Sequence, residues 1–370
     1  MERDFDGLKP SAQMDPLQSS PFMRACRREP TSYTPIWLMR QAGRYMPEYR
    51  SLRERVPFLD LCKRSELAAE VTVMAVKRLG VDAAIIFADL LLIVEPLGFA
   101  LEYTKGDGPV IHHPIRTGRD VERVRELSTV EPLDYVFRAV ELARRALPNH
   151  IPLIGFAGAP FTLASYLIEG GASRNFIHTK TLMRTDHGAW HELMSRLARA
   201  LARYLNAQIK AGAQAVQLFD SWVGALGPDD YRRYVLPHTR AVIEQITPGT
   251  PVIHFGTGTA GLLEALSEAG GDVIGIDWRI RLDQAWPRIG ERAIMGNLDP
   301  TTLFADLALV RQEAGAILDQ AQGRAGHIFN LGHGILPQTP MQNVIALVEA
   351  VHEISSSRPR DIGTRMSAPE

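Results

Sequence analysis

Residues 35–53 read PIWLMRQAGRYMPEYRSLR. The run Ile36–Met39 has no polar face, which is typical of a strand buried in a parallel sheet. Arginines follow this run directly, and the first of them falls at the carboxyl end of the predicted strand. We predict that four arginines lie in one loop: Arg40, Arg44, Arg50 and Arg53.

Arginine keeps its charge at any physiological pH, and its planar fork of N–H donors fits carboxylates and phosphates. Several such groups in one loop predict a site for a small molecule with several negative charges. The chain as a whole is not basic, because 41 lysines and arginines are balanced by 42 acidic residues, giving a formal net charge of -1. Nucleic-acid binding usually requires a basic domain, so we expect no nucleic-acid partner and a local anion site.

Composition indicates a globular protein of a reducing compartment. The 370 residues are 45% hydrophobic, enough for a large core. Cys26 and Cys62 are the only cysteines, too few for a disulfide scaffold or a Cys-rich metal site. The amino terminus lacks the apolar core of a signal peptide, and no run approaches the ~18 apolar residues of a membrane span. We therefore expect a cytoplasmic protein with no membrane partner.

Short apolar runs alternate with helical patterns along the chain, and polar or glycine residues cluster just after the runs. Alternation predicts a parallel sheet with helices outside, and a count of eight favours a closed (β/α)8 barrel of the TIM type. In such barrels the active site lies at the carboxyl ends of the strands. The predicted strands are residues 36–39, 83–87, 152–156, 215–219, 251–255, 273–276, 293–295 and 328–330.

The barrel is predicted to occupy one domain, residues 21–354. Residues 1–20 and 355–370 are rich in Ser, Pro and charge, so we predict mobile tails there. Residues 97–114 depart from the alternation and predict a hairpin that turns at 106–108.

Asp89 directly follows the predicted strand 83–87, so its carboxylate should emerge at the mouth of the barrel. A helix cap or a salt bridge is the plainer interpretation of a lone aspartate. Its place at the catalytic end of the barrel favours a second interpretation. In this interpretation, a carboxylate among arginines stays ionised and accepts N–H bonds or stabilises a cation.

Three further polar residues follow predicted strands. The plainer interpretation of Tyr166 is a packing residue whose hydroxyl lies at the rim of the barrel. Ser221 lacks a nucleophile elbow and assignable partners, so a hydrogen-bonding role is favoured over a nucleophilic one. His333 lies between two glycines that allow close approach of a ligand, and it is a candidate binder or proton carrier, or a loop histidine bonded to backbone.

Two other patterns concern cofactors. Gly256, Gly258 and Gly261 imitate the dinucleotide fingerprint, but the distance to Asp277 is wrong for the acidic partner and no βαβ domain begins there. The adjacent His112 and His113 cannot both face one metal from a regular strand, and the chain has no His-x-Cys or Cys-x-x-Cys spacing. We predict no metal.

Several motifs together resemble the uroporphyrinogen decarboxylase family, over roughly residues 24–354. The motifs are WLMRQAGRYMPEYR at 37–50, FADLL at 87–91, GFAGAPFTL at 155–163, FDSW at 219–222, GIDWR at 275–279, GNLDP at 296–300 and FNLGHGILPQTP at 329–340.

This resemblance implies a distorted barrel, a homodimer and cofactor-free conversion of the four acetate side chains of uroporphyrinogen III to methyls, which gives coproporphyrinogen III. It implies that Asp89 stabilises a protonated pyrrole and that the arginines bind the carboxylates. An arginine-bound water, Arg40 and Tyr166 are alternative proton donors, and Asp89, Arg40 and Tyr166 are the catalytic candidates. The implied substrate contacts are Arg40, Gln41, Ala42, Gly43, Arg44, Arg53, Asp89, Tyr166, Ser221 and His333.

Three alternatives remain. Corrinoid-linked methyltransferases resemble this fold, but they bind zinc through a His-x-Cys pair and a distant Cys, and His333 is followed by Gly334 and Ile335. An NAD-dependent oxidoreductase would use the 256–261 loop. A tetrapyrrole carrier without activity is the third alternative, and the presence of Asp89 and Arg40 argues against it.

Overall fold

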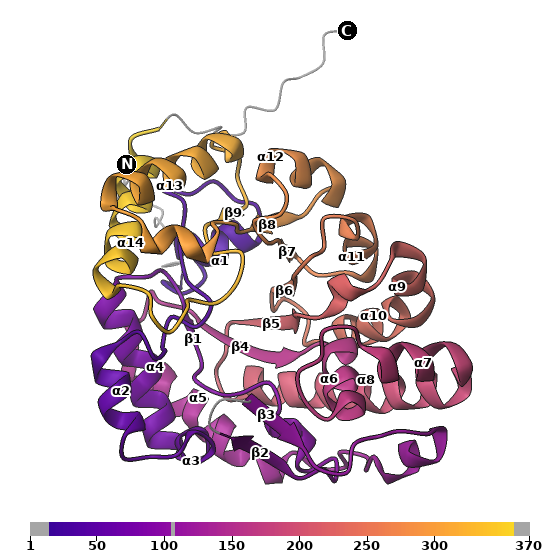
Figure 1. The fold of residues 1–370 in the computed structure, drawn as a ribbon. Coiled ribbons are helices and arrows are strands. Elements are labelled where there is room, and N and C mark those ends of the chain that lie inside the picture. The colour runs from indigo at the N-terminus through magenta and orange to yellow at the C-terminus, as the bar shows by residue number, and fades with distance from the viewer. Residues whose placement is uncertain (1–14, 105–107, 359–370) are drawn as a thin grey trace, which may run out of the picture.

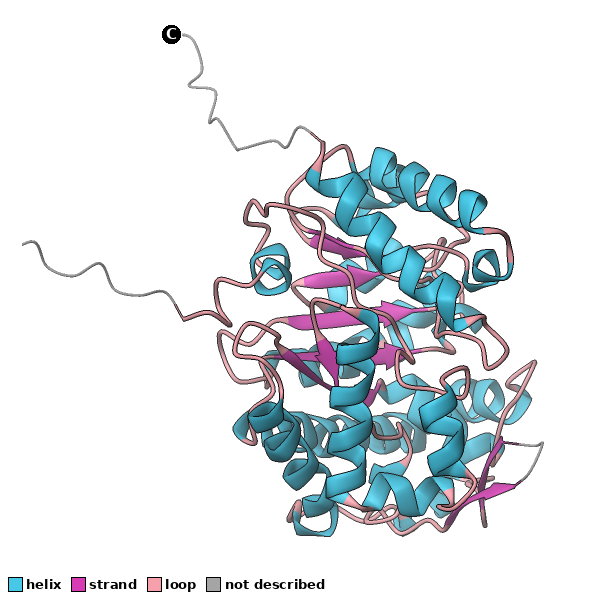
Figure 2. Cartoon of the chain, turned by 90° about the vertical axis from the view of Figure 1, so that its left-hand side faces the viewer, coloured by secondary structure: helices cyan, strands magenta, loops and turns pink. Residues whose placement is uncertain are grey.

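The computed structural model describes residues 15–104 and 108–358. A parallel seven-stranded sheet curls through the molecule, in the order β1-β4-β5-β6-β7-β8-β9, with helices packed on its outer side (Figures 1 and 2). The strands are β1 Ala84–Ile85, β4 Leu153–Gly158, β5 Ala215–Asp220, β6 Val252–Gly256, β7 Val273–Gly275, β8 Ala293–Met295 and β9 His327–Ile328. The predicted parallel α/β architecture is confirmed as a curled sheet, or half-barrel.

The prediction of a strand at residues 36–39 is wrong. This segment lies between the two edges of the sheet, and only Ile36 forms a β-bridge, parallel to Phe329. The Ile36 carbonyl accepts the Asp82 N–H at 2.8 Å beside β1, and the Pro35 carbonyl accepts the Phe329 N–H at 2.8 Å beside β9. The segment is therefore bonded to both edges without strand geometry.

Side chains explain why the segment is irregular. The Ile36 N–H donates to Asp82 Oδ2 at 2.7 Å, and the Met39 N–H donates to Asn330 Oδ1 at 3.1 Å. Backbone donors that would join a regular ladder are thus satisfied by side chains.

Helices follow most strands and supply the outer layer. The longest, α8, begins after Asp186, whose side chain accepts the Ala189 N–H, and α4 ends at Gly80, which takes a left-handed φ of 69°. The helices are α1 Pro21–Cys26, α2 Pro47–Arg53, α3 Phe58–Lys63, α4 Ser65–Leu79, α5 Asp134–Ala146, α6 Pro160–Glu169, α7 Ile177–Thr185, α8 His187–Lys210, α9 Pro228–Tyr234, α10 Leu236–Glu244, α11 Leu263–Ala269, α12 Leu282–Ala285, α13 Leu307–Ala321 and α14 Met341–Ser356.

The arginine loop is partly helical. Pro47 begins α2 at a position where its missing N–H costs no helical hydrogen bond, so Arg50 and Arg53 lie on a helix and not in the predicted loop. Arg40 and Arg44 remain in irregular backbone.

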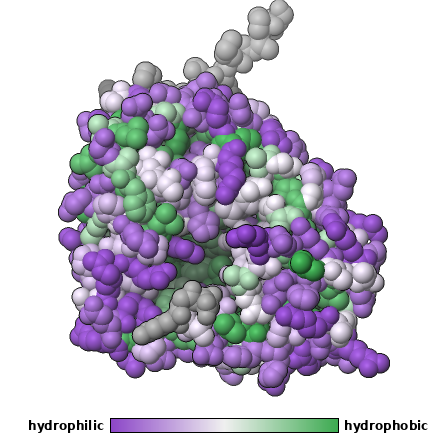
Figure 3. Space-filling model, viewed as in Figure 1, coloured by the Kyte–Doolittle hydropathy of each residue, from purple (hydrophilic) through white to green (hydrophobic). Residues whose placement is uncertain are grey.

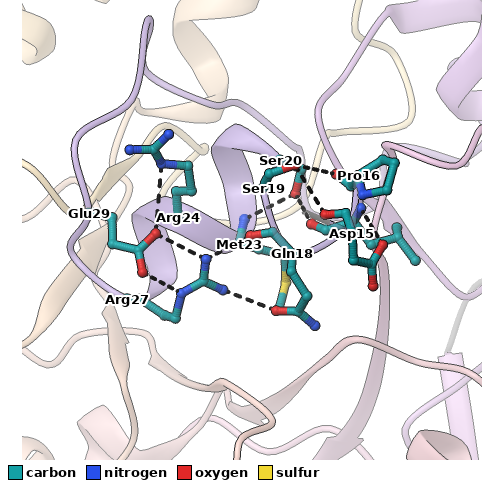
Figure 4. A network of polar contacts seen from close by, with 10 residues as sticks. Asp15, Pro16, Gln18, Ser19, Ser20, Met23, Arg24, Arg27 and Glu29 are labelled. Carbon is teal, nitrogen blue, oxygen red and sulfur yellow. Dashed lines mark hydrogen bonds and ion pairs between the residues drawn. The ribbon is translucent and has the colours of Figure 1, made fainter. Parts of the chain in front are cut away.

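The boundaries of both predicted tails shift. Residues 15–20 form a turn before α1, where Ser20 Oγ accepts the Met23 N–H and Arg27 bonds both Gln18 and Glu29 (Figure 4). At the other end, α14 continues beyond residue 354, and the Ser355 hydroxyl accepts the Thr34 N–H at 2.9 Å. The remaining tail residues, 1–14 and 359–370, lie outside the described residues.

The predicted hairpin is confirmed. Strands β2 (Leu101–Thr104) and β3 (Gly108–Ile111) pair antiparallel, separate from the main sheet. The predicted turn falls mostly on residues 105–107, outside the described residues. The hairpin lies at the edge of the face on which the carboxyl ends of the strands open (Figure 1).

Candidate active site

A cleft of about 1190 Å³ opens at the carboxyl ends of the strands. Its floor is apolar and includes Phe156, Phe219 and Phe255, whose rings contact edge to face in succession with centroid distances of 5.5 and 5.9 Å. Arginines stand around it: Arg40, Arg44, Arg53 and Arg55. Figure 3 shows the hollow with hydrophobic residues at its floor and hydrophilic residues on its rim.

The Arg40 backbone takes a φ of 60°, a region that non-glycine residues enter rarely. Its side chain then passes over Gly334, where an added Cβ would lie 2.4 Å from Arg40 Cδ. The glycine after His333 therefore makes room for the arginine, which explains part of the pattern that the sequence showed at 332–334.

Gly332, on the other side of His333, packs against Trp278, because an added Cβ there would lie 2.6 Å from the Trp278 backbone nitrogen. His333 lines the cleft between these two close contacts. Burial, together with the nearby positive charges of Arg40 and Arg279, lowers the pKa of His333 to about 4. The imidazole is neutral at pH 7, so it can bond to a ligand but carries no charge.

The two arginines of α2 have different partners. Arg50 Nη1 donates to the carbonyls of Arg44 and Tyr45 at 3.0 and 2.9 Å, so it fixes the loop, and it does not line the cleft. Arg53 lines the cleft, donates to the Val56 carbonyl and lies over the Phe58 ring at 5.6 Å.

Gln41, Ala42 and Gly43 also lie along the cleft. The Gln41 side chain is only 1% exposed, because Oε1 accepts the Leu38 N–H and Nε2 donates to the Ala83 carbonyl. That side chain supports the loop, so any ligand contact at Gln41 has to come from its backbone.

Asp89 lies in the cleft wall just after β1. Oδ1 accepts the Leu91 N–H at 2.9 Å, and Tyr103 lines the same cleft, where its side chain interacts with the carboxylate. Burial raises the pKa of Asp89 above its usual value, and hydrogen bonding by Tyr103 and Leu91 and the charge of Arg40 oppose that rise. That Asp89 stays ionised among the arginines remains a prediction, in which the charge of Arg40 acts against the larger effect of burial.

Tyr166 on α6 reaches the same cleft, and its ring lies 3.9 Å from that of Trp222, centroid to centroid, at 32°. Burial, together with the charge of Asp89, raises the pKa of Tyr166 to about 12, so the hydroxyl keeps its proton at neutral pH. Ser221 lines the cleft beside Trp222. Thr162 of α6 donates to Asp220 at 2.9 Å, which ties this helix to the end of β5.

Two of the three glycines, Gly256 and Gly258, lie in close contact with the neighbouring loop at Val223 and Gly224. The Thr257 carbonyl lies so close to Gly224 that a Cβ on Gly224 would be 2.2 Å away. The Gly258 N–H donates to Asp277 Oδ2 at 2.6 Å, and Asp277 also pairs with Arg279. The acid that a dinucleotide ribose would need is thus already bonded within the protein.

Among residues 15–104 and 108–358, no group of three or more His, Cys, Asp or Glu side chains is arranged to hold a metal ion. In the same part of the chain, no helix has both the length and the apolar character needed to cross a membrane.

Tyr103 is one of the cleft residues that sequence reasoning missed. It comes from the hairpin and not from a strand end of the sheet, and no local pattern places it beside Asp89. The sequence did contain its signal, an apolar–polar alternation in 101–104, but this fixes only the face of the strand.

An apolar floor flanked by arginines, with one buried carboxylate in its wall, is typical of an α/β enzyme and suits a flat molecule that carries anionic groups on its edge. The sequence model of the uroporphyrinogen decarboxylase family matches residues 17–354. Two relatives called uroporphyrinogen decarboxylase support the match. That of Carboxydothermus hydrogenoformans is 55% identical over 337 residues, 90% of this chain and 96% of the relative. That of Sorangium cellulosum is 56% identical over 335 residues, again 90% and 96%. The chain belongs to the uroporphyrinogen decarboxylase family.

Solved structures with low sequence identity share the fold. A methyltransferase from Methanosarcina mazei superposes with a TM-score of 0.74 at 20% identity, covering 90% of this chain and 98% of that one. A putative vitamin-B12 independent methionine synthase from Listeria monocytogenes gives 0.56 at 14% identity, covering 88% and 98%. At these identities the likeness concerns the fold alone.

Proposed function

We propose that this protein decarboxylates the four acetate side chains of uroporphyrinogen III to give coproporphyrinogen III. The observation that carries the proposal is the pairing of an apolar cleft floor with arginines on the rim and Asp89 in the wall. A reduced tetrapyrrole has the complementary form, with an apolar macrocycle, inward N–H groups and carboxylates around its edge. The family membership supports the same reaction.

The carboxylates of the substrate are bound by Arg40, Arg44 and Arg53, and the acetate that reacts is held by Arg40. Bidentate arginine–carboxylate bonds fix both the position and the orientation of a carboxylate. Gln41, Ala42 and Gly43 contribute the backbone of the same wall, and Ser221 and the neutral His333 bond to polar groups of the substrate.

The chemical step needs an electron sink. A proton adds to the pyrrole carbon beside the one that carries the acetate, and the ring becomes a cation. The bond to the carboxylate then breaks, its electron pair enters the ring, and carbon dioxide leaves. A proton adds to the remaining methylene carbon and the first proton leaves the ring, so each acetate exchanges carbon dioxide for one proton and becomes a methyl.

Asp89 stabilises that cation by accepting N–H bonds from the pyrroles at the centre of the macrocycle. Its buried position raises its pKa in the free protein. Pyrrole N–H donors and the developing positive charge oppose that effect, so substrate binding favours the ionised carboxylate. Tyr166, which keeps its proton at neutral pH, supplies a donor beside the reacting group.

The reaction as proposed uses no metal and no organic cofactor, because the protonated ring is itself the electron sink. We propose further that residues 35–39 complete a distorted (β/α)8 barrel within the domain 21–354. Their bonds to both sheet edges support this interpretation.

We also propose a homodimer in the cytoplasm. The family resemblance supports the dimer, and the free, buried thiols of Cys26 and Cys62 suit a reducing compartment. Sedimentation analysis of the purified protein tests the first proposal, and a monomer at micromolar concentration would contradict it.

The decisive experiment is anaerobic incubation of the purified protein with uroporphyrinogen III, without added metal or cofactor and with a chelator present. We expect products with seven, six, five and four carboxyl groups by chromatography. Folded protein that yields none of them would overturn the proposed function.

A further inference from the structure

We propose that Tyr103 is a positioning residue whose hydroxyl holds the Asp89 carboxylate. The remaining lone pairs of the carboxylate then face the substrate. This inference rests on the proposed function, since Asp89 is the group that would meet the pyrroles. It adds to that function a residue of the hairpin, outside the main sheet.

Strand β2 directs the tyrosine into the cleft. Leu101 is buried, Glu102 is exposed and lies with Oε2 2.9 Å from His112 Nε2, and Tyr103 lines the cleft. The alternation of a strand therefore puts Tyr103 on the inner face of the hairpin.

Aromatic contacts hold the Tyr103 ring. It meets the Phe58 ring edge on, with centroids 4.8 Å apart at 65°, and Phe58 meets Phe87 at 6.2 Å and 85°. Phe87 stands two residues before Asp89 in the same segment. Both members of the Tyr103–Asp89 pair are thus fixed by one set of rings.

The hairpin itself is attached to α6. The Ile111 N–H donates to the Gly170 carbonyl and the Ile115 N–H donates to the Leu167 carbonyl, each at 2.8 Å. Tyr166 belongs to this helix, so Tyr103 and Tyr166 reach the cleft from elements that are bonded together.

The surroundings of the Asp89 carboxylate explain why a hydroxyl donor matters there. Asp89 Oδ1 takes the Leu91 N–H, and burial disfavours the charged carboxylate. Burial also raises the pKa of Tyr103, so its hydroxyl stays a donor. A donor aimed at an ionised carboxylate stabilises that form. The titratable or charged groups that interact with Asp89 are Arg40, Cys62, Tyr103, Tyr135, Tyr166 and Tyr204.

The test is Tyr103→Phe, which removes the hydroxyl and keeps the ring against Phe58. We expect kcat/KM at neutral pH to fall about tenfold and the acidic limb of its pH profile to move up by about one unit, since a hydrogen bond to a charged group has that magnitude. Activity should recover as the pH rises, which a merely structural defect would not do.

The matched control is Tyr135→Phe. Tyr135 has a buried hydroxyl without a hydrogen-bond partner and does not line the cleft. Loss of the Tyr135 hydroxyl should leave the pH profile of kcat/KM unchanged.

A second measurement does not depend on enzyme activity. Carbon NMR of aspartate-labelled protein without substrate, with the Asp89 signal assigned through Asp89→Asn, should show the Asp89 titration move to higher pH in Tyr103→Phe. If Tyr103→Phe is active and neither the Asp89 titration nor the pH profile of kcat/KM moves, the role of Tyr103 is overturned. An inactive wild-type protein in which the titration does move would overturn the proposed function and leave the Tyr103–Asp89 interaction established.

Discussion

Arg40 occupies the space that a side chain at Gly334 would need, although 294 positions separate them in sequence: a Cβ on Gly334 would lie 2.4 Å from Arg40 Cδ and 2.6 Å from its Cγ. The position of Arg40, which is proposed to hold the reacting acetate, therefore depends on the absence of a side chain at Gly334 on another loop. This relationship can be tested without touching any charged group.

Gly334→Ala should displace Arg40 and leave the fold intact, because the φ of Gly334 is not one that requires glycine. We expect kcat/KM to fall by about tenfold to a hundredfold, the range for a lost hydrogen bond between charged groups. Steady-state assays with uroporphyrinogen III measure it. Gly261→Ala is the control, since an added Cβ there meets nothing within 4 Å. Equal activity of the two variants would contradict the dependence.

Asp89→Asn should abolish most turnover, by about a hundredfold or more in kcat, since an amide cannot stabilise the ring cation by charge. The fold should remain, because the amide oxygen can still accept the Leu91 N–H. Product chromatography and thermal unfolding measure the two effects. Unchanged turnover would refute the cation-stabilising role.

Arg50→Met should loosen the loop that presents Arg44. The variant loses two bonds to the carbonyls of Arg44 and Tyr45, so we expect KM to rise several-fold and the unfolding free energy to fall by about 1–3 kcal/mol. Arg138→Met is the control, because Arg138 pairs only with Glu141 on the outer surface of α5. Chemical unfolding and KM together test it, and an unchanged KM would show that the loop holds without Arg50.

His254 predicts acid sensitivity. It is fully buried on β6, and burial lowers its pKa from 6.5 to about 4. Between these values the unfolded chain binds a proton that the folded protein does not, so stability falls as pH decreases from about 6.5 to 4. The slope is about 1.4 kcal/mol per pH unit for one such histidine.

Urea unfolding between pH 7 and pH 4 measures that slope. His254→Leu should reduce it, whereas His150→Leu, at an exposed position, should not. Parallel slopes for wild type and His254→Leu would contradict the prediction.

Much of the fold could be predicted from sequence because it rests on local patterns. The apolar runs at β4, β5 and β6 form strands within a residue or two of their predicted ends, since all three are almost wholly buried. Residues 36–39 have the same apolar pattern but no strand, because Asp82 and Asn330 take their backbone N–H groups. No periodicity in the sequence reveals such distant side-chain acceptors.

The site divides in the same way. Strand-end residues such as Asp89, Ser221 and His333 were predicted together and lie in one cleft. The family resemblance implied a substrate contact for Arg53 and none for Arg50, and in the structure Arg53 lines the cleft whereas Arg50 bonds to the loop backbone. Tyr103 could not be found, because its place depends on how the hairpin folds over the sheet.

The bonds of residues 34–36 also set an order of events during synthesis. Thr34 bonds to Ser355 and Pro35 bonds to Phe329, so the first wall of the cleft to leave the ribosome has its partners in the last part of the chain. The segment that carries Arg40 can bond to Asp82 early, but its bonds to Phe329 and Ser355 form only after those residues have been made. A nascent chain cut short before α14 contains every proposed catalytic residue but lacks the bond that ties Thr34 to Ser355.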